Sequence, residues 1–179
     1  METNAVFKLV VLWEEGKIQL PVELESNTLG YFSSLEMIES FISSAIAGKQ
    51  KNFYLGKCIT FRIFEVTKYY LNQGCEPEGQ WVYDCNGQLI GGYDGPDTAP
   101  FFGRSEDQCR FKNGDPVIFL QGNRLLSGKI AALPISKAPD RVRLDQSDDC
   151  YLVTTGPESE NHSHPWIHRV FAENGTTLK

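Results

Sequence analysis

A single segment of this chain carries the pattern of an amphipathic helix. It reads "YFSSLEMIESFISSAIAGK" and covers residues 31–49. Its apolar residues recur at the spacing of one helix face, at Leu35, Ile38, Phe41, Ile42, Ala45 and Ile46. Gly48 is typical of the residue that follows a helix C-terminus. We therefore predict a helix from about Ser34 to Ala47, whose apolar face belongs to the protein core.

The residues before this helix predict how it begins. Ser33 and Glu36 have the three-residue spacing of a capping box, with Ser33 as the N-cap. Phe32 and Met37 then occupy the two positions of a hydrophobic staple. We expect these two apolar side chains to pack against each other at the helix entrance.

Most of the remaining first half is rich in β-branched and aromatic residues, which favour strands. Residues 7–13, "FKLVVLW", predict a strand, and residues 18–24, "IQLPVEL", predict a second strand that pairs with it as a hairpin. Pro21 lacks an N–H, so the second strand is expected to lie at an edge or to break there. Residues 58–71 predict a long strand.

A second hairpin is predicted within "WVYDCNGQLIGGY", residues 81–93. Asn86-Gly87 stands between two arms that contain apolar residues. This dipeptide favours a two-residue type I′ turn, because both positions accept a positive φ.

The second half predicts short strands punctuated by glycine, as in a small barrel or sandwich. Strands are expected at about Pro116 to Leu120, at Leu125 to Leu133, within "DCYLVTTG" (149–156) and within "WIHRVF" (166–171). We predict an α+β protein: an α+β domain over residues 1–95, a Gly/Pro-rich linker over 96–110, and a mostly-β domain over 111–179.

The second half also resembles a known layout. In "GDPVIFLQGNRLLSGKI", Gly114-Asp115 before a strand and Gly128 before the returning strand resemble the opening hairpin of an SH3-like barrel. Together with "YFSSLE", "YDCNG" and "HSHPWIHRVF", the chain is similar to a family of uncharacterised bacterial proteins over about Tyr31 to Phe171. The resemblance implies an SH3-like barrel after the helical segment, and it implies no activity, cofactor or site residue.

Composition limits the classes of partner. The chain has 179 residues and a formal net charge of −6, which disfavours nonspecific binding to nucleic acid or anionic membranes. No apolar run reaches the roughly 18 residues of a membrane span, so no membrane association is expected. Five cysteines, an odd number without a CxxC pair, indicate a reducing compartment, and we expect a cytoplasmic protein.

All three histidines, His162, His164 and His168, fall in "NHSHPWIH". In an extended segment, residues two apart share a face, so His162 and His164 could bind one zinc ion with His168 as the third ligand. Asp148 and Asp149 are candidate additional ligands. Such a site would indicate a metal-dependent hydrolase. The competing interpretation is a polar loop whose histidines are solvated or bonded to these carboxylates.

Residues 104–143 form a basic stretch, with eight Lys/Arg against four acidic residues. Phe101 and Phe102 precede it and Phe111 lies within it, and basic loops with exposed aromatic rings can bind nucleic acid. A mixed, solvated surface is the alternative interpretation.

No nucleophile motif such as GxSxG is present. Cys150 follows Asp149, whose negative charge would raise rather than lower the thiol pKa. We therefore expect a non-enzymatic interaction protein whose partner is another protein. A zinc-dependent hydrolase and a nucleic-acid-binding module remain the two alternatives.

Overall fold

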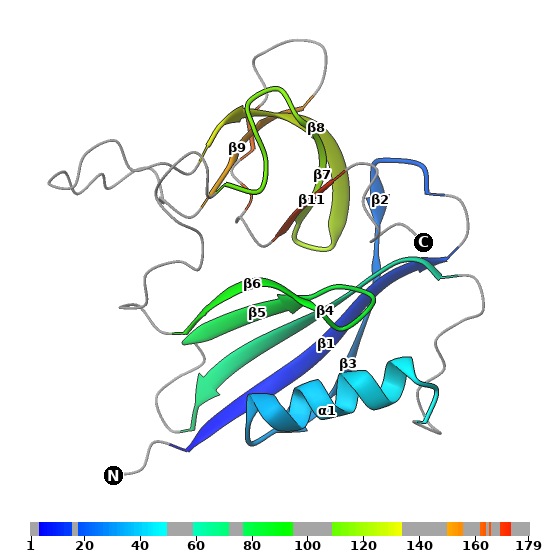
Figure 1. Cartoon of the computed structure of the whole chain (residues 1–179), viewed down its shortest axis with the longest axis vertical. Helices are drawn as coiled ribbons and strands as arrows, with labels where there is room; N and C mark the ends of the chain where they lie inside the picture. Colours follow the sequence, from blue (N-terminus) through cyan, green and yellow to red (C-terminus); the bar gives the residue numbers. More distant parts are fainter. Residues whose placement is uncertain are drawn as a thin grey trace, which may run out of the picture. The chain divides into compact units, whose positions relative to one another are not determined.

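The computed structural model describes residues 4–15, 18–49, 59–71, 77–94, 109–133, 150–155, 162–163, 165 and 169–172. The chain forms two compact units, and each contains one antiparallel sheet. Figure 1 shows the strands of both units and the helix, which belongs to the first unit. Each unit is described in turn.

The first unit is a five-stranded antiparallel sheet with the order β3-β1-β4-β5-β6. Its elements are β1 (Ala5–Glu15), β3 (Glu25–Phe32), α1 (Leu35–Ile46), β4 (Ile59–Tyr70), β5 (Gly79–Tyr83) and β6 (Leu89–Asp94). Both β3 and β4 run antiparallel to β1, which lies between them. They are therefore parallel to each other, and α1 is the crossover that connects them, as in a split β-α-β unit.

The core of the first unit lies between α1 and one face of this sheet (Figure 1). Alternation along β1 turns Phe7, Leu9 and Val11 toward the helix, where Ile38 and Ile42 of α1 are fully buried. The predicted helix and its apolar face are confirmed. Ala45 is also buried, and Leu35, Phe41 and Ile46 pack against this core. Leu12, Ile63 and Val82, which alternate with the helix-facing residues, are also buried.

The start of α1 corrects the prediction by one residue. The N-cap is Ser34, not Ser33, and its side-chain oxygen accepts a hydrogen bond from the Met37 N–H. The predicted staple is also absent, because Met37 is exposed and Phe32 packs against Phe41 with ring centroids 5.4 Å apart. The rule failed because two consecutive serines offer the same capping chemistry in neighbouring registers.

The partner of β1 differs from the prediction. Residues 25–32, which carry little apolar alternation, form β3 and pair with β1 from Phe7↔Phe32 to Trp13↔Glu25. Within the segment expected to pair with β1, only β2 (Val22–Glu23) is a strand, and it begins directly after Pro21. β2 pairs instead with β8 of the second unit.

The β5–β6 hairpin is confirmed, but its turn is not the predicted two-residue type. The Asp84 N–H donates to the Gln88 carbonyl and the Gly87 N–H to the Asp84 carbonyl, so three residues form the loop. The Asp84 carboxylate accepts two further backbone N–H groups, from Asn86 and Gln88. Gly87 takes a φ of 76°, which matches the left-handed residue that ends such a three-residue loop.

The second unit is an antiparallel sheet in which β10-β9-β8-β7-β11 are successive neighbours and β2 also pairs with β8. Its further strands are β7 (Pro116–Gln121), β8 (Arg124–Ala132), β9 (Leu152–Thr154), β10 (His162–Ser163) and β11 (Val170–Ala172). The four strands predicted for this half are present, whereas β10 lies in a predicted loop. Phe111, Val117, Phe119 and Tyr151 are among the residues of its core.

The described chain is thus an α+β protein, mostly antiparallel β with a single helix. The division into units assigns β2 to the second unit although it lies within residues 1–95. Most of the expected linker, residues 96–108, lies outside the described residues. Within the described part of the chain, α1 is too short to cross a membrane, and it is the only α-helix there.

Candidate functional site

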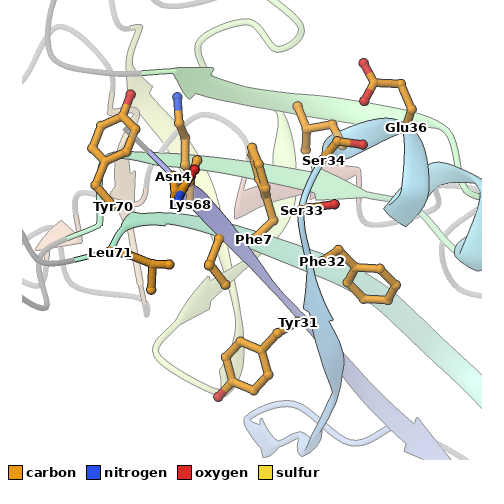
Figure 2. A pocket seen from close by; sticks show the side chains of 13 residues that line it. Asn4, Phe7, Tyr31, Phe32, Ser33, Ser34, Glu36, Lys68, Tyr70 and Leu71 are labelled. Carbon is orange, nitrogen blue, oxygen red and sulfur yellow. The ribbon is translucent and has the colours of Figure 1, made fainter. Parts of the chain in front are cut away.

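A pocket of about 860 Å³ opens at one end of the first unit. Three separate parts of the chain line it: residues 4–7 at the start of β1, residues 31–36 from the end of β3 into α1, and residues 68, 70 and 71 at the end of β4. Figure 2 shows the side chains of these residues. We refer to this cavity as the β1–α1 pocket.

The pocket exists because β1 extends further than β3. The last residue of β3, Phe32, pairs with Phe7. The chain then leaves the sheet, and α1 begins after its N-cap, Ser34. Ala5 and Val6 therefore pair with β4 on one side only within the described residues. Because the Leu71 N–H donates to the Asn4 carbonyl, the alternating ladder directs the N–H and C=O of Ala5 away from β4, toward the open side.

One row of paired residues crosses all five strands beside the pocket. Phe32, Phe7, Lys68, Gly79 and Asp94 are successive cross-strand partners from β3 to β6. Lys68 Nζ reaches over Gly79 and lies 2.6 Å from Asp94 Oδ1. The row thus places two phenylalanines at one end and an ion pair at the other.

Lys68 is held in its charged form. Burial opposes the charge, but the hydrogen bond to Asp94, together with the interaction with Tyr70, outweighs it and raises the Lys68 pKa. The ammonium group also lies 4.9 Å from the centroid of the Tyr70 ring. Only 13% of the Lys68 side chain is exposed, against 50% of the Asp94 side chain.

Glu36 lies across the pocket from Lys68, in the first turn of α1 (Figure 2). A hydrogen bond from the Ser34 hydroxyl lowers the Glu36 pKa, and a second bond from its own backbone N–H acts in the same direction. Glu36 is therefore a carboxylate at neutral pH. Ser34 and Glu36 together occupy backbone donors that a helix N-terminus otherwise offers to a ligand.

Exposed apolar side chains gather around this pocket. Four large hydrophobic residues are exposed in the described chain: Tyr31 at 67%, Met37 at 54%, Leu71 at 53% and Leu89 at 46%. Tyr31 and Leu71 line the pocket, and Met37 follows its lining residues on α1. Leu89, on β6, is not part of it. Clustered exposed apolar groups are typical of an interaction site.

The predicted histidine site is described only in part. His162 lies in β10, where its backbone pairs with Thr154 of β9. His164, His168, Asp148 and Asp149 lie outside the described residues. Among the residues that are described, no group of three or more His, Cys, Asp or Glu side chains is placed to hold a metal ion.

The predicted basic stretch is likewise described in part, through Arg110, Lys112, Arg124 and Lys129. The Arg110 guanidinium lies 5.2 Å from the centroid of the Phe111 ring, although the residue is exposed to solvent. Arg110 thus packs on an aromatic ring of the unit's core. Cys150 is half-buried, as are Cys85 and Cys109.

Sequence reasoning did not find the β1–α1 pocket. Its lining comes from three segments that the sequence separates by more than twenty residues each, and pairing of β1 with β3 and β4 brings them together. Tyr31 and Leu71 carried a weak signal, since each is a large apolar residue at the end of a strand. Comparison of the chain with protein-family models, with curated proteins and with solved structures gives no match.

Proposed function

We propose that this chain is a non-enzymatic binding protein, and that the β1–α1 pocket holds an extended segment of a partner protein. The observation that carries the proposal is an edge of β1 at Ala5 that the described strands leave open, with exposed Tyr31 and Leu71 beside it. A strand edge supplies backbone hydrogen bonds to an extended chain, and neighbouring apolar side chains supply contact area.

The shape of the pocket favours a protein segment over a small molecule. Small-molecule sites usually enclose most of the ligand surface. Here Tyr31 and Leu71 are more than half exposed although they line the cavity. An extended segment bound beside β1, in line with β3, would pair with Ala5 and cover the Tyr31 and Leu71 side chains.

The electrostatics of the pocket favour binding over proton transfer. A general acid or base works best when its pKa lies near the working pH. The Lys68 pKa is raised and the Glu36 pKa is lowered, so both groups keep their charge through the neutral range. Within the described lining, the charged side chains support attraction and orientation of a ligand.

The proposal is tested with phage-displayed random octapeptides selected on the full chain. The Kd of a selected peptide is then measured by fluorescence anisotropy for the wild type and for Tyr31→Ala, Leu71→Ala and Leu89→Ala. We expect the two pocket variants to weaken binding by about tenfold each, the equivalent of about 1.4 kcal/mol. Leu89→Ala is the matched control, because Leu89 is an exposed apolar residue outside the pocket.

Failure to select any peptide would overturn the proposal. So would a peptide whose binding responds equally to Leu89→Ala and to the pocket variants. Thermal unfolding of each variant shows whether the fold is intact, and substitution of exposed side chains is expected to change stability by less than about 0.5 kcal/mol.

For the second unit, we propose that its sheet is the curved half of an SH3-like barrel, in line with the resemblance at Gly114-Asp115 and Gly128. The pairing of β8 supports this. β7 pairs along one edge of β8, whereas on its other edge β2 pairs with the first residues and β9 with the last ones. The bacterial family resemblance and a cytoplasmic location remain proposals based on sequence. Zinc binding and nucleic-acid binding gain no supporting observation from the described residues.

A further inference from the structure

We infer that the segment held in the β1–α1 pocket carries basic side chains beside its apolar ones. This inference rests on the proposed function, because it names the chemistry of the same partner. It follows from which charged groups around the pocket are already engaged and which remain open to a ligand.

The groups that line the pocket and would attract an anion are engaged within the protein. Lys68 Nζ lies 2.6 Å from Asp94 Oδ1, so an incoming carboxylate must compete with an existing ion pair. At the N-terminus of α1, the Met37 N–H donates to Ser34 Oγ. The Glu36 backbone N–H interacts with the Glu36 carboxylate and helps to lower its pKa. An acidic ligand would meet this carboxylate before it met a helix donor.

The groups that would attract a cation are accessible. Glu36 is exposed, and within the described part of the chain it forms no ion pair with a basic side chain. The exposed Tyr31 ring also lines the pocket, but Tyr31 alternates with Phe32 and therefore points to the other face of the sheet from Glu36, where its cross-strand partner is Lys8. An exposed carboxylate at the rim of the pocket suits a side chain with a cationic head and an apolar stem.

The wider charge of the first unit acts in the same direction. Its described residues include nine acidic and four basic side chains, a net charge of −5. This field attracts basic segments and repels acidic ones as they approach. Short-range and long-range electrostatics therefore select the same class of partner.

The inference is tested with three fluorescein-labelled octapeptides that share the same alternating apolar residues. The intervening positions are arginine in one peptide, glutamine in the second and glutamate in the third. On the full chain at low salt, we expect the arginine peptide to bind about two- to fivefold more tightly than the glutamine peptide for each exposed charge pair formed. The glutamate peptide should bind most weakly, and added salt should reduce these differences.

Two variants assign the effect to named groups. Glu36→Gln should reduce the preference for arginine over glutamine. Asp94→Asn releases Lys68 from its ion pair, so it should strengthen binding of the glutamate peptide by about two- to fivefold. Lys68→Met in the Asp94→Asn background should remove that gain.

The outcomes separate this inference from the proposed function. Equal binding of all three peptides, lost on Tyr31→Ala, would keep the pocket as a binding site and overturn the charge selection. Tighter binding of the glutamate peptide would also overturn it. Absence of binding by every peptide up to about 1 mM would overturn both proposals.

Discussion

Lys68 and Asp94 form an ion pair although their strands are not neighbours. β5 lies between them, and the Lys68 side chain spans it at Gly79, where Nζ meets Asp94 Oδ1 at 2.6 Å. Adjacent strands are about 4.8 Å apart, so this contact bridges roughly twice that separation. The absence of a side chain at Gly79 leaves room for the Trp81 ring, which a Cβ at this position would approach to 2.8 Å.

Gly79→Ala should destabilise the fold. A Cβ at this position would lie 2.8 Å from the Trp81 ring and 3.0 Å from the Tyr93 carbonyl oxygen. We expect a loss of about 1–3 kcal/mol, since the buried ring and the backbone must both shift. Urea unfolding measures the change. Gly30→Ala is the control, because its Cβ meets only the Phe32 ring, at 3.2 Å. An equal loss in both variants would contradict the prediction.

Asp94→Asn should lower the Lys68 pKa. The carboxylate that favours the ammonium is removed, whereas the burial that opposes it remains. Because the folded-state pKa is raised, the pair contributes stability below the ordinary lysine pKa of 10.5 and loses it as the pH rises further. At neutral pH the loss should be below about 1 kcal/mol, since Asp94 is half exposed. NMR titration of the Lys68 ammonium measures the shift, and an unchanged pKa would argue against the pair.

Ser34→Ala should cost about 1 kcal/mol of stability through loss of the N-cap bond to the Met37 N–H. Ser33→Ala is a matched control one residue earlier. Ser33 donates its hydroxyl to the exposed Met37 sulfur, so its removal should change stability by less than about 0.5 kcal/mol. Thermal unfolding of the two variants distinguishes the registers, and a larger loss for Ser33→Ala would place the cap where the sequence alone predicts it.

Tyr83→Phe should destabilise the fold at neutral pH by about 0.5–1.5 kcal/mol, because the Tyr83 hydroxyl donates to Glu39 Oε1 of α1 at 3.1 Å. Burial, reinforced by the Glu39 charge, raises the Tyr83 pKa above its ordinary value of 10.0. Above pH 10 the unfolded tyrosine ionises while the folded one keeps its proton, so wild-type stability falls. The difference between wild type and Tyr83→Phe should shrink there. Denaturant unfolding at pH 7 and above pH 10 measures it, and a constant difference would contradict the assignment.

Local patterns predicted the parts of the fold that depend on local chemistry. The spacing of Ile38 and Ile42 identified the helix and its buried face. The strands β7 and β8 were predicted because a short turn joins them and fixes their pairing. Asn86-Gly87 located a hairpin, yet its turn depends on the Asp84 carboxylate, which holds two backbone N–H groups.

The missed features depend on pairing between distant segments. β3 has exposed residues from Glu25 to Thr28, so no alternation marks it, and its strand form depends on pairing with β1. The pocket arises where that pairing ends at Phe32. A strand edge at Ala5 cannot be read from Ala5 itself, since it depends on where another strand stops.

The path of the chain through β2 has a practical consequence for dissecting this protein. Val22 and Glu23 leave the first sheet after β1 to pair with Leu125 and Arg124, and the chain then returns as β3. Neither unit is one continuous stretch of sequence. A fragment that starts near residue 96 lacks β2, which belongs to its sheet. A fragment that stops there retains β2 without the sheet with which β2 pairs. Cutting the chain once cannot yield two intact halves.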